Sequence, residues 1–365
     1  MLEFIIKIII CGMDVHERTI KVCTAVGNGP SEIKTFANTE AGRNALIRYL
    51  RDLAKKYGCG KIETAYEACM LGFGLHDELS VAGIVSHVLA PSLMRKSRKD
   101  VKRKTDEFDA RMIFETLRGH VLAGNRLPTV WVPPRAVRED REVVRARLEL
   151  GNKATTVKAQ IQMLLKTHEV RKPAAVGDSW TLRHRMWLHG LLADGGPELP
   201  TGSKIVLSSL LRQLTMLEAE IKTLDQAVET LSRKPRYQVA CQALVKQIKG
   251  VGLLTAMVFL TEVGDLKRFH NRRQLGSYLG LAPTCNESGE VVDRKGHISR
   301  SGTARVRWVL CQASWARLRY DPAESAVFER IRKGSKKLSR VALTACMRRL
   351  AIQMWHTAQD ALAAA

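Results

Sequence analysis

The chain has 365 residues, of which 45% are hydrophobic, so it has enough length and apolar content for two or three folded domains. This composition excludes a disordered protein and a mini-protein. Lys and Arg number 59 against 36 Asp and Glu, and the net charge of +23 indicates a polyanionic partner, of which nucleic acid is the commonest.

The cysteines and the first apolar run bear on the cellular compartment. The eight cysteines form no Cys-x-x-Cys pair, and none lies at metal-ligand spacing from a histidine, which predicts reduced thiols and no structural zinc. The apolar run at 4–10 contains Lys7, is too short to span a bilayer and lacks a signal-peptide cleavage pattern. We therefore expect a cytoplasmic protein without a membrane partner.

Residues 1–124 alternate between strand and helix patterns. An apolar run at 5–13 and alternating segments at 19–25 and 32–37 predict three antiparallel strands. The patterns that follow predict, in order, a helix, a strand, a helix and a strand: 40–56, 61–66, 72–81 and 85–90. This order is that of the ribonuclease-H-like fold, so the sequence predicts an α/β domain of this type.

Residues 125–239 are expected to form a central helical region. Two long helical patterns flank a stretch rich in Pro and Gly, and the second pattern carries a heptad repeat. Its apolar positions are Leu210, Leu214, Leu217, Ile221, Leu224, Val228 and Leu231. Two interpretations fit this repeat equally well. One is a dimerising coiled coil, and the other is a helical hairpin within one chain, whose partner face would be Val143, Leu150, Val157 and Leu164.

Residues 240–365 are predicted to form a mostly helical domain. The segment 248–252 followed by a helix at 253–262 has the form of a helix-hairpin-helix turn. There, Lys249, Gly250 and Gly252 would let backbone N–H groups approach a phosphate closely. An ordinary tight turn explains Gly-x-Gly as well, and only the surrounding basic residues favour phosphate binding.

Four acidic residues lie where a ribonuclease-H-like fold would bring them together. Asp14 ends the first strand, Glu67 ends the fourth, and Asp106 and Asp109 lie on one face at the start of a helical pattern. The first and fourth strands are neighbours in such a sheet. Four carboxylates need cations between them near neutral pH, because like charges raise one another's pKa. Two Mg²⁺ ions would meet this need and would support phosphodiester chemistry.

A basic run leads directly into the last two acids. Its members are Arg95, Lys96, Arg98, Lys99, Lys102, Arg103 and Lys104. Such a run is commonly a solvated face, and a single acid at a strand end is commonly a cap. The position of the run beside a predicted metal site favours instead a loop that follows the phosphates of a nucleic acid.

Ser288 is a second candidate for chemistry. It lies in a polar loop at 283–289, where a serine is usually a turn residue. As a nucleophile it would need a base or a metal that this loop does not supply. Basic residues suited to phosphate oxygens follow it, among them Arg294, Lys295, Arg300, Arg305 and Arg307.

Several motifs together resemble the insertion sequence 110/116/902 transposases. Segments 12–15, 66–68, 90–92 and 104–110 resemble the N-terminal DEDD domain of that family. Other positions resemble the C-terminal transposase domain of the same family. They are Phe269 and the segments 248–252, 279–283, 288–289 and 296–302. The resemblance covers about residues 8–120 and 240–320. One departure is that Ser299, Arg300 and Thr303 stand where the family usually has a lysine and an asparagine, although Arg300 keeps the charge.

The resemblance implies a RuvC-type N-terminal domain, whose Asp14, Glu67, Asp106 and Asp109 bind Mg²⁺. Ser288 would be the nucleophile of a site-specific DNA recombinase that exchanges strands through a phosphoserine link. A bridge RNA would choose donor and target DNA by base pairing. Dimers joined by the middle helices would pair into a tetramer, in which Ser288 of one subunit meets the acids of another. Such a protein is expected in the bacterial or archaeal cytoplasm, at the nucleoid when it acts.

Two other functions remain open. One is a metal-dependent, structure-selective nuclease, similar to a Holliday-junction resolvase, which uses water and has Ser288 as a loop residue. The other is a non-catalytic nucleic-acid-binding scaffold, in which the acids are structural. The substitution Ser288→Ala separates a recombinase from a nuclease, and Asp14→Asn separates both enzymes from a scaffold.

Overall fold

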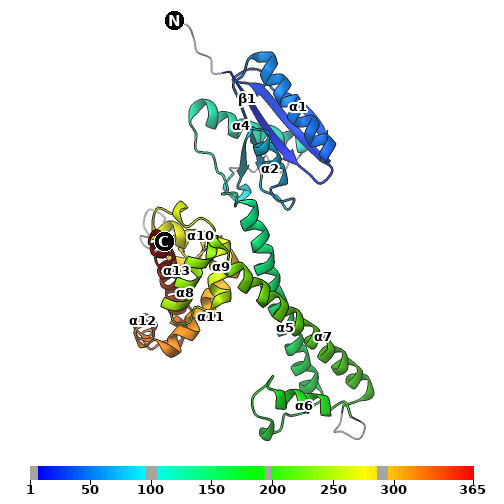
Figure 1. Ribbon diagram of the computed structural model, residues 1–365, viewed down its shortest axis with the longest axis vertical. Coiled ribbons are helices and arrows are strands. Elements are labelled where there is room, and N and C mark those ends of the chain that lie inside the picture. Colours follow the sequence, from blue (N-terminus) through cyan, green and yellow to red (C-terminus); the bar gives the residue numbers. More distant parts are fainter. Residues whose placement is uncertain (1–6, 95–104, 194–198, 286–294) are drawn as a thin grey trace. The chain divides into compact units, whose positions relative to one another are not determined.

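The computed structural model describes residues 7–94, 105–193, 199–285 and 295–365. Their contacts divide the chain into two compact units, one that ends at Val132 and one that begins at Pro133 (Figure 1). The first unit contains a five-stranded sheet with helices, and the second is mostly helical. The predicted class, an α/β part followed by an α part, is confirmed.

The five-stranded sheet of the first unit has the order β3-β2-β1-β4-β5. The strands β1 and β2 and the strands β2 and β3 pair antiparallel, whereas β4 lies parallel to β1 and to β5. The strands are β1 (Ile8–Val15), β2 (Thr19–Val26), β3 (Glu32–Ala37), β4 (Lys61–Glu67) and β5 (Val85–Leu89). The helices are α1 (Glu40–Tyr57), α2 (Gly74–Val81), the short η1 (Pro91–Leu93) and α4 (Asp106–Ala123). The predicted order of elements and the pairing of the first and fourth strands are confirmed.

Alternation along β1 sends side chains to two separate cores. Ile9, Cys11 and Met13 pack with residues of α1 and α2, while Ile8 and Ile10 pack with residues of α4. Because successive side chains of a strand point to opposite faces, α1 and α2 cover one face of the sheet and α4 covers the other.

The helix α4 approaches β1 closely at one glycine. A Cβ atom added at Gly12 would overlap the backbone nitrogen and Cα of Phe114, in the middle of α4. Only a residue without a side chain permits this approach. Asp106 lies about two turns before Phe114, so the contact places the N-terminus of α4 near the end of β1.

The second unit begins with a helical hairpin. The helices α5 (Arg135–Thr167) and α7 (Thr201–Ser232) pack along each other, with the short η2 (Ala174–Val176) and α6 (Leu182–Gly190) between them in the chain (Figure 1). Of the predicted heptad positions, Leu214, Leu217, Val228 and Leu231 are buried. The predicted hairpin within one chain is therefore present, and a coiled coil between two chains remains a prediction.

The buried face of α5 is turned from the predicted one. Val157 is buried as expected, but Val143, Leu150 and Leu164 are only partly buried. The other buried positions are Asp140, Val144, Leu148, Ala154, Ile161 and Leu165. An α-helix has 3.6 residues per turn, so a heptad pattern read at 3.5 drifts around a helix of this length.

The rest of the second unit is a helical core with one small hairpin. Its helices are α8 (Pro235–Gln247), α9 (Leu253–Val263), η3 (Leu266–Arg268), α10 (Arg272–Tyr278), α11 (Ala304–Tyr320), α12 (Pro322–Arg332), η4 (Lys336–Leu338) and α13 (Ser339–Ala363). The strands β6 (Pro283–Cys285) and β7 (Lys295–Ile298) pair antiparallel. No helix among the described residues is both long enough and apolar enough to cross a membrane.

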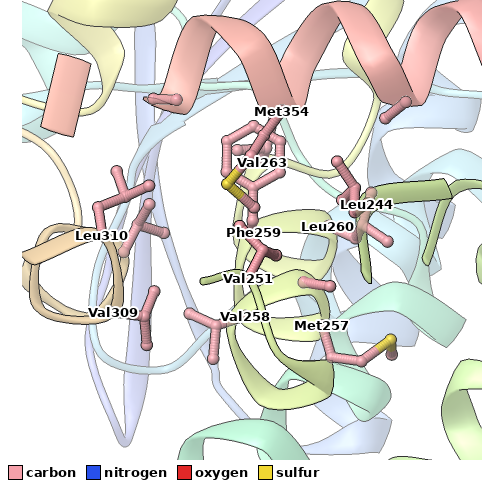
Figure 2. Packing of buried hydrophobic residues seen from close by; sticks show 14 of the residues in the cluster. Leu244, Val251, Met257, Val258, Phe259, Leu260, Val263, Val309, Leu310 and Met354 are labelled. Atoms are coloured by element: carbon pink, nitrogen blue, oxygen red, sulfur yellow. The ribbon is translucent and has the colours of Figure 1, made fainter. Parts of the chain in front are cut away.

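The helix α9 is the centre of this core. Every residue from Ala256 to Val263 is buried, and Figure 2 shows Phe259 and its neighbours among side chains of α11 and α13, such as Leu310 and Met354. The carboxylate of Glu262 accepts two hydrogen bonds from Arg145 of α5, at 2.6 and 2.8 Å. This bidentate pair fixes one end of the hairpin to the core, since removing Arg145 would leave the buried carboxylate of Glu262 without its charge partner.

We predict that Gly12→Ala destabilises the protein by about 1–3 kcal/mol or more, because the added methyl group must push α4 away from β1. Urea unfolding followed by circular dichroism would measure this loss. Gly60→Ala is the matched control, because a Cβ atom at Gly60 meets no atom within 4 Å. Equal stability of the two variants would contradict the proposed tight packing.

Candidate active site

Three side chains meet where β1 ends and α4 begins. The Nε2 atom of His16 lies 3.0 Å from Oδ2 of Asp14 and 3.5 Å from Oδ1 of Asp106. One potential ligand atom from each of the three residues lies within 4.8 Å of the others. Within the described part of the chain, this is the one group of three acidic, histidine or cysteine side chains close enough to hold an ion.

Local structure fixes each member of this group. The backbone N–H of His16 donates to the carbonyl of Thr19 at 2.9 Å, which closes the turn between β1 and β2. The side chain of Asn38 donates to the carbonyl of His16 at 2.7 Å and holds the turn from the other side. The hydroxyl of Thr105 caps α4 by accepting from the N–H of Phe108, so the helix begins at Asp106.

Burial and neighbouring charges both act on Asp14. Its side chain is 16% exposed, against 55% for Asp106. Burial raises the pKa of Asp14, and the nearby carboxylates of Asp109 and Asp106 raise it further, whereas His16 opposes them. A cation beside Asp14 would therefore stabilise its charged form.

The donor set fits a divalent cation. Carboxylate oxygens are the preferred ligands of Mg²⁺ and Mn²⁺, and an imidazole nitrogen is a common ligand of transition metals. Asp14, His16 and Asp106 offer both kinds of donor from two rigid elements. These three residues are the ones that would hold such an ion.

Asp109 and Glu67, the other predicted acids, lie at the edge of this group. Asp109 follows Asp106 by one turn of α4 and acts on Asp14 through its charge. Glu67 ends β4, one residue after Tyr66, which is the register partner of Met13 in β1. By alternation, Glu67 faces the same side of the sheet as Asp14. Neither Asp109 nor Glu67 has a ligand atom within 4.8 Å of the ligand atoms of all three residues in the group.

Two residues near the site were not found from the sequence. His16 follows the end of β1, so strand periodicity did not assign it to a face. Its only signal was the short distance in sequence from Asp14. Lys21 is the register partner of Asp14 on β2, and its Nζ lies 3.5 Å from Oε1 of Glu107. The position of Lys21 opposite Asp14 depends on the register of the hairpin, which is set by the length of its turn. The sequence pattern alone does not give this register.

Several predicted residues lie outside the described part of the chain. They are the seven basic residues Arg95, Lys96, Arg98, Lys99, Lys102, Arg103 and Lys104, together with Ser288 and Arg294. The segment that contains Ser288 connects β6 to β7. The roles of all nine residues stay predictions.

The predicted helix-hairpin-helix turn lies between α8 and α9. Gly250 has a left-handed backbone with φ of 80°, and a Cβ atom there would lie 2.8 Å from Cγ of Arg317 on α11. Packing thus explains Gly250 without a ligand. Lys249 is exposed, and the space around Gly252 is open. Phosphate binding at these two residues remains a prediction.

The predicted arginines of the C-terminal region make contacts within the protein. Arg307 donates to the carbonyls of Leu279 and Gly302, at 3.1 and 2.7 Å, and burial lowers its pKa. Arg305 lies 3.4 Å from the carboxylate of Glu149. Arg300 has a left-handed backbone, and Lys295 begins β7. The contacts of Arg307 join the segment before β6 to the segment after β7. Nucleic acid binding by the four residues stays a prediction.

Two transposase family models match separate parts of this chain. A family model described as Transposase, and named for the DEDD transposases of IS110, matches residues 11–169. A second model, described as Transposase IS116/IS110/IS902 family, matches residues 242–329. The first match includes all four predicted acids, and the second includes Ser288.

Individual relatives match over most of their length. The putative transposase y4rJ of Sinorhizobium fredii is 30% identical over 306 residues, which cover 79% of this chain and 75% of the relative. The putative transposase y4qE of the same organism is 28% identical over 96% of this chain and 88% of the relative. The transposase for insertion sequence element IS1533 of Leptospira borgpetersenii is 24% identical over 83% of this chain and 84% of the relative.

We predict that millimolar Mg²⁺ or Mn²⁺ stabilises the metal-free protein by about 1–3 kcal/mol, as expected for a ligand at 10 to 100 times its Kd. Asp14→Asn and Asp106→Asn should each remove most of this gain, measured by thermal unfolding with and without a chelator. The matched control on α4 is Glu115→Gln, because Glu115 pairs with Arg118 outside the group. A full metal response in both Asp variants would contradict the assignment.

We also predict how the stability of the metal-free protein depends on pH. The pKa of Asp14 is raised in the folded state, so its neutral form favours folding. This contribution is present at low pH and is lost as the pH rises through the folded pKa. Asp14→Asn should remove this decline, which melting temperatures measured across the acid range would test. An unchanged pH profile in the variant would contradict the electrostatic interpretation.

Proposed function

Because this chain belongs to the IS110/IS116/IS902 family of transposases, which cleave and rejoin DNA, we propose that it is a site-specific recombinase that excises and inserts its own insertion sequence. The observation that carries the proposal is the group of Asp14, His16 and Asp106 at the end of β1. The strand order β3-β2-β1-β4-β5, with α4 against β1, supports a RuvC-type assignment of the first unit.

The proposed site uses Asp14, Glu67, Asp106 and Asp109 around two Mg²⁺ ions. When bound, such ions would polarise the scissile phosphate and lower the pKa of an attacking hydroxyl. The chain's own residues supply the rest. Asp14 and Asp106 orient their oxygens from a strand end and a capped helix, and His16 offers a further donor between them. Lys21 lies across from Asp14 in the sheet, where a cation would attract the DNA phosphate.

In the proposed reaction, Ser288 attacks the phosphorus of one DNA strand. Its Oγ forms a bond to phosphorus while the bond to the 3′ oxygen breaks, which leaves a 5′-phosphoserine and, after uptake of the proton lost by serine, a 3′-hydroxyl. Rejoining reverses these steps, since the 3′-hydroxyl of another strand attacks the phosphoserine and restores the serine. The number of phosphodiester bonds is conserved, so no energy-supplying cofactor is required.

We propose that a bridge RNA pairs with donor and target DNA and so chooses the sites. The net charge of +23 supports binding to nucleic acid. Assembly into dimers and a tetramer is also proposed. It is supported by exposed apolar side chains on the hairpin and α6, among them Met163, Leu182, Met186 and Met216. The protein would act in the bacterial or archaeal cytoplasm, at the nucleoid.

We predict a denaturant-stable protein–DNA adduct when the protein is incubated with Mg²⁺, DNA of its element ends and RNA transcribed from the flanking non-coding region. Ser288→Ala should abolish the adduct, and Asp106→Asn should lower its yield by about 100-fold or more, as loss of a group acting on the transition state does. Denaturing gel electrophoresis with labelled DNA measures both. Glu115→Gln is the control, because it removes a carboxylate of α4 that pairs with Arg118 outside the site.

The outcomes separate the competing functions. An adduct that requires RNA and Ser288 supports the guided recombinase. Cleavage without an adduct, unchanged in Ser288→Ala, would instead indicate a nuclease that uses water. Binding without cleavage, unaffected by Asp14→Asn, would indicate a scaffold.

A further inference from the structure

Two tryptophans of α11 are exposed although large aromatic side chains are usually buried. Trp308 is 48% exposed and Trp315 is 43% exposed. They are seven residues apart, so they lie on one face of the helix, about 10 Å apart along its axis. Neither belongs to the site described above, and the other tryptophans, Trp131, Trp180, Trp187 and Trp355, are not among the exposed side chains.

The surroundings of these tryptophans are basic. The helix α11 contains four arginines and no acidic residue, and Arg319 is exposed one turn after Trp315. The acids Glu324 and Glu329 of α12 are paired with Arg317 and Arg332. No Asp or Glu occurs from 330 to 359. That stretch carries Arg330, Arg332, Lys333, Lys336, Lys337, Arg340, Arg348 and Arg349. A polyanion is therefore the partner that fits this surface electrostatically.

The tryptophan face is held rigidly. On the opposite side of α11, Val306, Leu310 and Ala313 are buried in the core. Arg317 is buried as well and donates to Gln353 and to Glu324, at 2.7 and 3.1 Å, which fixes α11 against α13 and α12. A platform that is fixed before binding loses little conformational freedom when a ligand stacks on it.

Trp315 also connects the platform to the basic stretch. Its ring centroid lies 5.9 Å from that of Phe328 on α12, and the guanidinium of Arg332 lies 5.9 Å from the same phenyl ring. Phe328 is itself buried, so it supports Trp315 and the bases would stack on the tryptophans alone. Exposed aromatic faces beside guanidinium groups are the combination that binds unpaired bases by stacking and their phosphates by charge.

We propose that Trp308 and Trp315 form a stacking platform for unpaired nucleotides of a nucleic acid strand. The inference rests on the proposed function for its partner and specifies the surface that takes single strands. Bases in a duplex are already stacked, so their faces are not open to the tryptophans. A second copy of this chain is a poor occupant, because its own basic surface would be repelled.

The test compares single strands with a duplex on the full-length protein. Fluorescence anisotropy would measure binding of a labelled, unstructured 12-nucleotide RNA, of the DNA of the same sequence and of a 12-base-pair DNA duplex, at one fixed salt concentration. The double variant Trp308→Leu with Trp315→Leu keeps apolar side chains at both positions but removes the aromatic faces. The double variant to Phe keeps those faces. Val81→Ala, at an exposed apolar residue of α2 outside every proposed surface, is the matched control.

We expect the Leu variant to weaken single-strand binding by about 10-fold or more, with duplex binding changed less than about 2-fold. The Phe variant and Val81→Ala should bind single strands within about 3-fold of the unchanged protein. A loss for RNA alone would identify the guide as the occupant, and a loss for DNA alone would identify an opened DNA strand. Either supports the platform, and circular dichroism would verify the fold of each variant.

Three results would overturn the proposal. They are unchanged single-strand binding in the Leu variant, an equal loss of duplex binding, and a change of oligomeric state caused by Leu but not by Phe. No cleavage is measured, so a failure here leaves the chemistry of Ser288 standing. A missing adduct would likewise leave the stacking result standing.

Discussion

The close approach of α4 to β1 at Gly12 is the constraint on which the candidate active site depends. Phe114 lies against the backbone of the strand because no Cβ intervenes. From that contact, about two turns of helix lead back to Asp106, whose carboxylate reaches the turn after β1. The same contact buries the α4 face of the sheet, which includes Asp14. The packing of α4 on the sheet and the burial that raises the pKa of Asp14 therefore both depend on Gly12, a residue without a side chain in a central strand.

That packing works against the charge of the site. Asp14 is partly removed from water and is near Asp106 and Asp109, so its ionised form is less favourable than in an unfolded chain. Only His16 among the causes acting on it favours the charge. Two apolar cores, on either side of the sheet, offset this cost and hold the acids in place. A site that is held together against its own repulsion binds a divalent cation more strongly than a flexible cluster would.

Strands and helices with a clear hydrophobic periodicity could be predicted from the sequence. Contacts that depend on the register between strands could not. The strands and helices of the first unit follow from apolar alternation, and Asp14 and Glu67 were assigned to neighbouring strand ends from strand order alone. His16 and Lys21 required the register of a hairpin turn. The partners of Arg307 are carbonyls of two separate loops, so its place in the fold had no signal in composition or spacing. Contacts between residues far apart in the sequence cannot be predicted from patterns that extend over only a few residues.

The distribution of charge follows from the chemistry proposed for the chain. A cluster of carboxylates repels a phosphodiester, so a protein that brings DNA to such a site needs a positive field elsewhere. Here 59 basic residues exceed 36 acidic ones, and the stretch from 330 to 359 has no acidic residue at all. Long-range attraction from such surfaces is independent of nucleotide sequence, which suits the proposed choice of sites by a paired RNA. Trp308 and Trp315 add what charge alone lacks, since aromatic faces distinguish an open strand from a closed duplex.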